Sequence, residues 1–180
     1  MNKAYQIHNQ SSVYFLTFQV VGWVDVFSRQ CYRDLIIDNL DYCRNNKGLN
    51  LHAYVIMTNH IHLVVSHRNK DLSGWVRDFK KHIAKEVFKM IDEVNESRRE
   101  WMRIVFSHHG KYSPRNVLKQ FWTQENHAVE LYNNDLMDTR VNYIHQNPVR
   151  AGWVQNAEDY LYSSARNFAK LDTLIDIDEL

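Results

Sequence analysis

The stretch VIMTNHIHLVV, residues 55–65, combines an apolar strand pattern with two histidines. Successive side chains of a strand point to opposite faces of its sheet, so His60 and His62 share one face. The apolar residues between and after them share the other. The residues expected to face the core are Ile61, Leu63 and Val65. The stretch therefore predicts a sheet with an apolar face against a core and a pair of imidazoles on the opposite face.

Strand and helix patterns alternate on both sides of this stretch. Gly48 is expected to end the first helix, and either Asp71 or Ser73 can cap the second. The expected elements are strands at 13–20, 51–57, 60–66 and 119–124 and helices at 30–46 and about 72–94, with a tight turn at 58–59. On the strand at 51–57, the residues expected to face the core are Leu51, Ala53, Val55 and Met57.

This order of elements predicts an α+β fold of the ferredoxin-like, split βαβ type. The antiparallel sheet has helices on one face, and a tyrosine-bearing helix is expected near the other, open face. Residues 95–118 are interpreted as an insertion, with a helix at SRREWMRIVF followed by a loop. The whole chain, residues 1–180, is interpreted as a single domain.

Composition and charge are those of an ordinary globular protein, with 44% hydrophobic and 24% charged residues. No apolar run reaches the length of a membrane span, and a cytoplasmic protein with no membrane partner is expected. Cys31 and Cys43 lack zinc-site spacing and are expected to be buried free thiols. The net charge of +1 neither favours nor disfavours nucleic-acid binding. The tail LDTLIDIDEL, however, carries four acidic residues and no basic residue. The rest of the chain is therefore more basic than the total.

The histidine pair has two interpretations. Two imidazoles side by side on a sheet face can bind a divalent metal. Histidines beside a turn can equally be ordinary surface residues, since the chain contains ten. A metal site requires a third ligand, which is sought in the segment DTRVNYIHQNPVRAGWV, residues 138–154.

That segment places Tyr143 and Asn147 four residues apart, on one side of a helix. Pro148 disfavours helical geometry at Asn147, so the helix is expected to end or kink there. Tyr143 is either a packing residue or a nucleophile. A phenol is a poor nucleophile at neutral pH, and a metal on the scissile phosphate compensates for this. A tyrosine beside a metal site therefore suits phosphoryl transfer.

The motifs resemble those of a known family. MTNHIHLVV is similar to the HUH motif of single-tyrosine, IS200-like transposases, and YIHQNPVRAGWV is similar to their tyrosine-helix motif. The asparagine before proline is typical of the REP-associated tyrosine transposases, and YLYSSARNF, residues 160–168, resembles their serine-pair motif. The resemblance extends from about Val13 to Phe168, but residues 95–118 depart from the shorter members.

The resemblance implies an enzyme that nicks single-stranded DNA at a hairpin and transfers the strand through a 5′-phosphotyrosine. Tyr143 would be the nucleophile, and His60, His62 and Asn147 would bind Mg²⁺ or Mn²⁺. Gln146 is an alternative third ligand. Some relatives are dimers and the REP-associated subgroup tends toward monomers, so the oligomeric state is open.

Candidate DNA-binding residues are basic. The long helix carries a row of basic side chains opposite its apolar stripe, and this row is either a phosphate-binding surface or a solvated face. Further basic side chains flank the tyrosine, and Trp122 and Tyr112 either stack on DNA bases or pack in the protein. The candidate basic residues are Arg77, Lys80, Lys81, Lys85, Arg140 and Arg150.

Two alternatives to strand transfer are considered. The first is a domesticated protein that binds hairpin DNA with little or no cleavage. The second is a metal-dependent phosphodiesterase in which Tyr143 is structural. Both would use the same fold.

Overall fold

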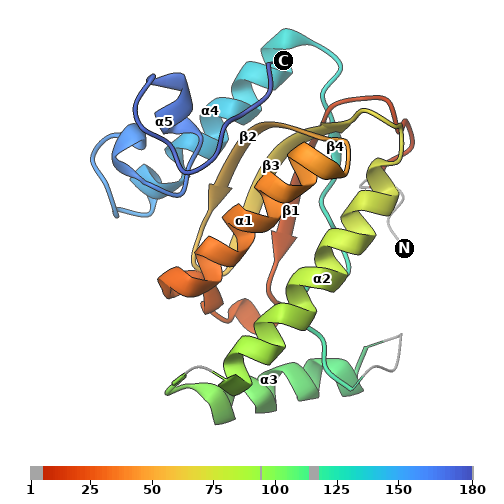
Figure 1. Ribbon diagram of the computed structural model, residues 1–180, viewed down its shortest axis with the longest axis vertical. Helices are drawn as coiled ribbons and strands as arrows, with labels where there is room; N and C mark the ends of the chain where they lie inside the picture. The colour runs from red at the N-terminus through yellow and green to blue at the C-terminus, as the bar shows by residue number, and fades with distance from the viewer. Residues whose placement is uncertain (1–5, 94, 114–117, 180) are drawn as a thin grey trace.

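The structure is a computed structural model that describes residues 6–93, 95–113 and 118–179. Four strands and five α-helices in these ranges form an α+β fold (Figure 1). The elements are β1 (Tyr14–Gln19), α1 (Gln30–Asn46), β2 (Leu49–Ile56), β3 (His60–His67), α2 (Leu72–Glu93), α3 (Arg99–Lys111), β4 (Val129–Glu130), α4 (Asn134–Arg150) and α5 (Ala165–Phe168).

The sheet has the order β2-β3-β1-β4. β3 pairs antiparallel with both β1 and β2, and β4 pairs antiparallel with β1. The parallel strands β1 and β2 are thus separated by β3, which is the split βαβ arrangement that the sequence predicts. The predicted ferredoxin-like fold is confirmed.

The helices α1 and α2 lie across one face of the sheet (Figure 1). Their apolar stripes meet alternate residues of the strands, Leu16 and Phe18 of β1 and the predicted core residues Ile61 and Leu63 of β3. Gly48 follows α1 with a φ of +76°, a left-handed conformation that favours glycine and turns the chain into β2. Asp71 begins α2 by accepting a hydrogen bond from the Gly74 amide. The main core therefore lies between these two helices and the sheet.

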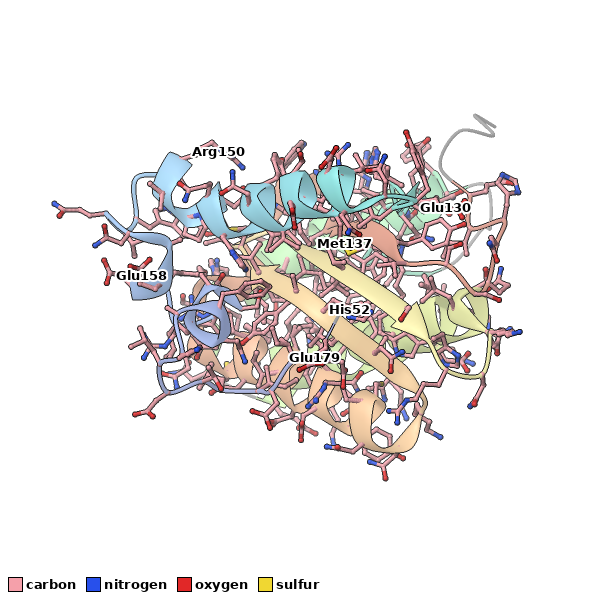
Figure 2. All side chains as sticks on the ribbon, turned by 90° about the horizontal axis from the view of Figure 1, so that it is seen from above. His52, Glu130, Met137, Arg150, Glu158 and Glu179 are labelled. Carbon is pink, nitrogen blue, oxygen red and sulfur yellow. The ribbon has the colours of Figure 1, made fainter. Side chains whose placement is uncertain are left out.

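The second face of the sheet is covered by α4 (Figure 2). A smaller apolar cluster fills the space between them, with Met137 on the side of α4 that faces the strands. The cluster's buried members are Phe15, Ala53, Val55, Met57, Val64, Leu131, Val141 and Ile144. The face that the sequence leaves open is therefore covered by the tyrosine-bearing helix.

The predicted alternation on β2 is wrong beyond Leu51. A bulge lies between Leu51 and Ala53, which pair with the consecutive residues Val65 and Val64. The extra residue, His52, reverses the alternation. Leu51 packs with α1 and α2 as expected, but the other three predicted residues belong to the α4 cluster. Those residues are Ala53, Val55 and Met57.

The fourth strand is not where the sequence pattern predicts it. Within 119–124, Trp122 forms only an isolated bridge to Val20, whereas β4 pairs with Tyr14 and Phe15. Phe121 and Trp122 are buried among the aromatic side chains of the main core. The apolar pattern of this segment therefore reflects core packing rather than strand pairing.

The ends of two helices differ from the sequence prediction. The helix that carries Tyr143 was expected to end or kink at Asn147, but α4 does not end there: it contains Pro148 and continues to Arg150. Pro148 is buried, and the chain after it closes the helix with the hydrogen bond from the Ala151 amide to Asn147. α3 extends to Lys111, through most of the predicted loop. Val94 and residues 114–117 lie outside the described residues.

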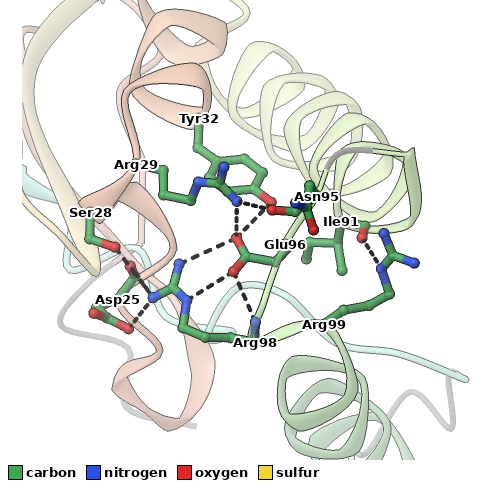
Figure 3. Close-up of polar contacts among 9 residues, drawn as sticks. All are labelled: Asp25, Ser28, Arg29, Tyr32, Ile91, Asn95, Glu96, Arg98 and Arg99. Atoms are coloured by element: carbon green, nitrogen blue, oxygen red, sulfur yellow. Dashed lines mark hydrogen bonds and ion pairs between the residues drawn. The ribbon is translucent and has the colours of Figure 1, made fainter.

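α3 is attached to the fold through a buried carboxylate (Figure 3). Glu96 accepts hydrogen bonds from Arg29 (3.3 Å), the Tyr32 hydroxyl (3.2 Å) and the Arg98 side chain and amide (both 3.1 Å). Arg98 also donates to Asp25 (2.9 Å). Burial alone would raise the pKa of Glu96, but the hydrogen bonds from Arg98 outweigh burial and lower it to about 2. This Glu96 network, formed by Asp25, Arg29, Tyr32, Glu96 and Arg98, holds the α2–α3 connection against the start of α1.

Candidate active site

The two histidines lie at the start of β3, on the face that α4 covers. His62 pairs with Thr17 of β1 and Val55 of β2, so it occupies the middle of the sheet. The ring centroids of His60 and His62 lie 4.8 Å apart, and His62 also stacks on Phe15 at 5.3 Å. The sequence prediction that the two imidazoles are neighbours on one face is confirmed.

Both imidazoles are in the neutral form that a metal ligand requires. Burial lowers the pKa of His60. Burial, followed by the proximity of the second titratable ring, that of His60, lowers the pKa of His62 to about 3. At neutral pH each ring therefore carries one protonated and one unprotonated nitrogen.

Tyr143 lies on the sheet-facing side of α4, beside the histidines. Its ring centroid is 5.4 Å from that of His62 and 5.9 Å from that of Phe15. Its residue surface is 37% exposed, so a substrate can reach the side chain. The structure thus brings together the predicted nucleophile and the predicted metal-binding pair within one chain.

Other tyrosines are less suited to the same role. The hydroxyl of Tyr160 donates to the backbone oxygen of Ile56 (2.7 Å), and burial raises its pKa to about 12. Tyr132 is 80% exposed and is not in the ring contacts around His62. Tyr143 is therefore the best-placed candidate nucleophile.

Asn147 lies one turn after Tyr143, half-buried on the same side of α4. Its amide nitrogen donates to the Tyr143 backbone oxygen at 3.4 Å, and its side-chain oxygen is the atom that can bind a metal. Gln146 is also half-buried. In the described ranges, no three residues among His, Cys, Asp and Glu are grouped in a way that could hold a metal. A complete site here would therefore combine two imidazoles with an amide oxygen, a donor set that suits a divalent ion such as Mn²⁺.

Two of the predicted basic residues lie at this site. The Arg150 guanidinium stands 4.4 Å from the Tyr143 ring centroid and donates to the Tyr143 backbone oxygen (2.9 Å). The Arg140 guanidinium lies 5.1 Å from the Phe15 ring centroid, and its Nε atom has no hydrogen-bond partner among the described residues. The positive charges of Arg140 and Arg150 contribute to lowering the pKa of His62, because they disfavour its protonated form. The site is therefore positively charged around Tyr143.

The basic row on α2 lies away from the histidines, because α2 packs on the other face of the sheet. Arg77, Lys81 and Lys85 are exposed, and Arg77 pairs with Asp78 at 2.8 Å. Lys80 instead donates from Nζ to the Thr123 backbone oxygen and the Asn126 side chain. The row borders a groove of about 410 Å³ between α2 and the segment that precedes β4.

The two aromatic candidates differ in exposure. Trp122 is 6% exposed and donates its indole N–H to the Lys80 backbone oxygen, so it is a packing residue. Tyr112 is exposed at the end of α3 and contacts the His108 ring. Cys43 is buried and Cys31 half-buried, and both are free thiols as predicted.

A serine that the sequence assigns only by resemblance fixes α4 to the sheet. The Tyr54 amide of β2 donates to the Ser164 hydroxyl (2.9 Å), and the Ser164 amide donates to the Tyr54 oxygen (2.9 Å). His145 of α4 shares a hydrogen bond with the same hydroxyl (2.9 Å) and packs on the Phe168 ring. The serine-pair segment thus links the edge of β2 to the helix that carries Tyr143. Only its sequence motif could have revealed this role.

Residues 16–121 match the family described as "Transposase IS200 like". This stretch is more than half of the chain and contains both histidines. The chain belongs to the IS200-like transposase family. The match ends before Tyr143, so the site assignment on α4 depends on the geometry described above.

Two further comparisons concern this IS200-like transposase. A search of curated proteins gave no match. Among solved structures, the chain is similar to a REP-associated tyrosine transposase bound to a REP hairpin, with a TM-score of 0.64 and 18% identity. The alignment covers 99% of this chain and 93% of that one, and at this identity it shows the fold. In the part of the chain that the structure describes, no helix has the length and apolarity to span a membrane.

Proposed function

We propose that this IS200-like transposase nicks single-stranded DNA beside a hairpin and transfers the strand through a 5′-phosphotyrosine on Tyr143. The observation that carries the proposal is the ring contact between Tyr143 and His62, with centroids 5.4 Å apart. A nucleophile beside a metal-binding imidazole is the combination that metal-assisted phosphoryl transfer requires. The motifs YIHQNPVRAGWV and YLYSSARNF support the REP-associated subgroup.

The proposed metal ligands are His60, His62 and Asn147, with Mg²⁺ or Mn²⁺ as the ion. The two neutral imidazoles and the amide oxygen fit a divalent cation. When bound, the ion withdraws charge from the scissile phosphate and stabilises the charge that develops in the transition state. On the sheet, His62 lies opposite Thr17 and stacks on Phe15, a member of the apolar cluster under α4.

In the proposed reaction, the Tyr143 hydroxyl oxygen attacks phosphorus and forms a new O–P bond. The bond from phosphorus to the 3′ oxygen breaks, the phenol proton passes to solvent, and the departing 3′ oxygen takes up a proton. The 5′ phosphate stays on Tyr143 until another 3′ hydroxyl reverses the step. A hydrolase has no need for this intermediate, whereas strand transfer does.

The basic side chains are proposed to bind DNA. Arg140 and Arg150 stand on α4 on either side of Tyr143, so they can bind the phosphates that flank the scissile bond. Arg77, Lys81 and Lys85 are proposed to bind the phosphate backbone of the hairpin. Lys80 is a weaker candidate, because its Nζ atom is engaged with Thr123 and Asn126.

One experiment tests the proposal against both alternatives. The protein is incubated with labelled hairpin DNA carrying single-stranded flanks and with Mn²⁺, then denatured and separated by electrophoresis. A denaturation-resistant protein–DNA adduct supports strand transfer. Binding without cleavage favours a domesticated hairpin-binding protein, and cleavage without an adduct favours a phosphodiesterase. Either of these last two results contradicts the proposed function.

A further inference from the structure

The turn between β2 and β3 provides a hydrogen-bond acceptor for the first histidine. The Asn59 side-chain oxygen lies 2.7 Å from Nδ1 of His60. The amide nitrogen of Asn59 donates to the Trp23 backbone oxygen at 3.4 Å. Since a carbonyl oxygen can only accept, the Trp23 contact determines which arm of the amide carries nitrogen. The oxygen therefore faces His60, and Nδ1 of His60 must carry the proton.

The second histidine has its partner across the strand pair. Thr17 is directly opposite His62 in the β1–β3 register, and its hydroxyl lies 2.8 Å from Nδ1 of His62. Thr17 is a polar residue in a strand whose neighbours Leu16 and Phe18 are fully buried. Because the face of Thr17 also holds Phe15 and His62, its hydroxyl points toward the imidazole pair rather than toward solvent or the main core.

The two contacts act on the same atom of each ring. In a neutral imidazole, one nitrogen carries the proton and the other carries the lone pair. A metal bound through Nε2 requires the proton on Nδ1, and a hydrogen bond from Nδ1–H to an acceptor fixes both this tautomer and the ring orientation. The Asn59 oxygen accepts from His60, whereas the Thr17 hydroxyl can accept or donate at Nδ1 of His62, so its role as acceptor belongs to the proposal below. The two partners come from different segments, the β2–β3 turn and β1.

We propose that Asn59 and Thr17 are positioning residues that accept from Nδ1–H of His60 and His62, which would leave the Nε2 lone pair of each ring free for the proposed metal. The inference rests on the proposed metal site and adds the residues that prepare it. Neither residue touches the reacting atoms. Their effect is on metal affinity and on the proton position in each imidazole.

Mn²⁺ binding provides the first test, measured by calorimetry on the DNA-free protein. Asn59→Leu and Thr17→Val should each weaken Mn²⁺ binding about 10- to 100-fold, the usual cost of losing such a partner. Asn59→Asp and Thr17→Ser keep an acceptor and should bind Mn²⁺ much as wild type does. Asn50→Leu is a matched control, because Asn50 also bonds a side chain across the sheet, that of Ser66. Wild-type affinity in both Asn59→Leu and Thr17→Val would overturn the inference.

The tautomers provide a second test that does not depend on a variant folding. Nitrogen-15 spectra of the metal-free wild-type protein should show His60 and His62 protonated at Nδ1. Protonation at Nε2 in either ring would contradict the assignment of its partner. Adduct formation by the wild-type protein tests the proposed function separately. If wild type forms the adduct but the variants bind Mn²⁺ with unchanged affinity, the positioning role is contradicted and the proposed function stands. If wild type binds no Mn²⁺, both the metal site and its positioning residues fail.

Discussion

The Glu96 network and the His–Tyr cluster, formed by His60, His62 and Tyr143, both contain buried polar side chains. They differ in how their polar atoms are used. Glu96 is 4% exposed, and its carboxylate is surrounded by donors from Arg29, Tyr32 and Arg98. In the His–Tyr cluster, the side chains of the two histidines form hydrogen bonds at Nδ1, and the Tyr143 side chain makes ring contacts. The first cluster is arranged to hold chain segments together. The second is the proposed site for a metal ion and DNA.

Removing the nucleophile should have the largest effect. Tyr143→Phe deletes one oxygen and keeps the ring that packs on Phe15 and His62, so the fold and Mn²⁺ binding should remain. Adduct formation should fall by more than about 10³-fold, because the atom that forms the new bond is gone. Gel detection of the covalent adduct measures this, with Tyr132→Phe and Tyr160→Phe as controls that should form it normally. An undiminished adduct from Tyr143→Phe would refute the assignment.

Removing an imidazole should come next. His62→Ala or His60→Ala should reduce cleavage by about 10³-fold, since the proposed metal would supply several kcal/mol of charge stabilisation. Hairpin affinity should stay close to wild type, because binding depends on basic residues elsewhere. Cleavage rates and gel-shift affinities measure the two effects. Full nicking by either variant in Mg²⁺ would remove the metal-site proposal.

A substitution in the Glu96 network should lower the stability of the fold rather than the rate of cleavage. Glu96→Gln removes the charge that three donors surround and should lower the free energy of unfolding at pH 7 by about 3 kcal/mol. Glu100→Gln is the control, since Glu100 is an exposed partner of Arg103 and should cost less than about 0.5 kcal/mol. Urea unfolding measures both. Equal stability of the two variants would mean that the network does not hold α3.

The same carboxylate sets a pH dependence. The pKa of Glu96 is lowered in the fold from 4.5 to about 2, so its contribution is fully present above pH 4.5 and is lost as the pH falls toward 2. The stability difference between wild type and Glu96→Gln should therefore shrink over this range. A difference that stays constant from pH 6 to pH 2 would contradict the lowered pKa.

The basic row on α2 should show the smallest effect. Lys81→Ala and Lys85→Ala should each weaken binding to different hairpins alike and reduce the slope of log affinity against log salt by about 0.9 per lost phosphate contact. Fluorescence anisotropy across a salt titration measures this. Lys89→Ala is a matched control on the same helix, where Lys89 pairs with Glu93. Wild-type salt dependence in both test variants would identify the row as a solvated face.

Local patterns predicted most of the fold. The alternation in β1 and β3 and the apolar stripes of α1 and α2 each depend on one element facing one core, so periodicity identifies them. The bulge at His52 escaped prediction because both faces of β2 are apolar, which removes the signal that would reveal a change of face. Pro148 was expected to end or kink the helix at Asn147, because proline disfavours helical geometry in the residue before it, but α4 continues past it to Arg150.

The candidate site was predicted less evenly. Spacing along the sequence identified the histidine pair and the Tyr143–Asn147 pair, because both are local. The hydrogen-bond partners at Thr17 and Asn59 were missed, since strand register rather than sequence distance brings Thr17 opposite His62. Ser164 was found only through its motif, as its hydrogen bonds to Tyr54 and His145 span distant parts of the chain.

The docking of α4 on its own sheet has a kinetic consequence. Because Ser164 and His145 fasten the tyrosine helix to the sheet that carries the histidines, the proposed nucleophile and the proposed metal ligands lie together in one chain. If Tyr143 is the nucleophile, the first cleavage is then first order in protein, and its rate per molecule stays constant on dilution. A site assembled from two chains would instead lose activity as the concentration falls below the dissociation constant of the pair.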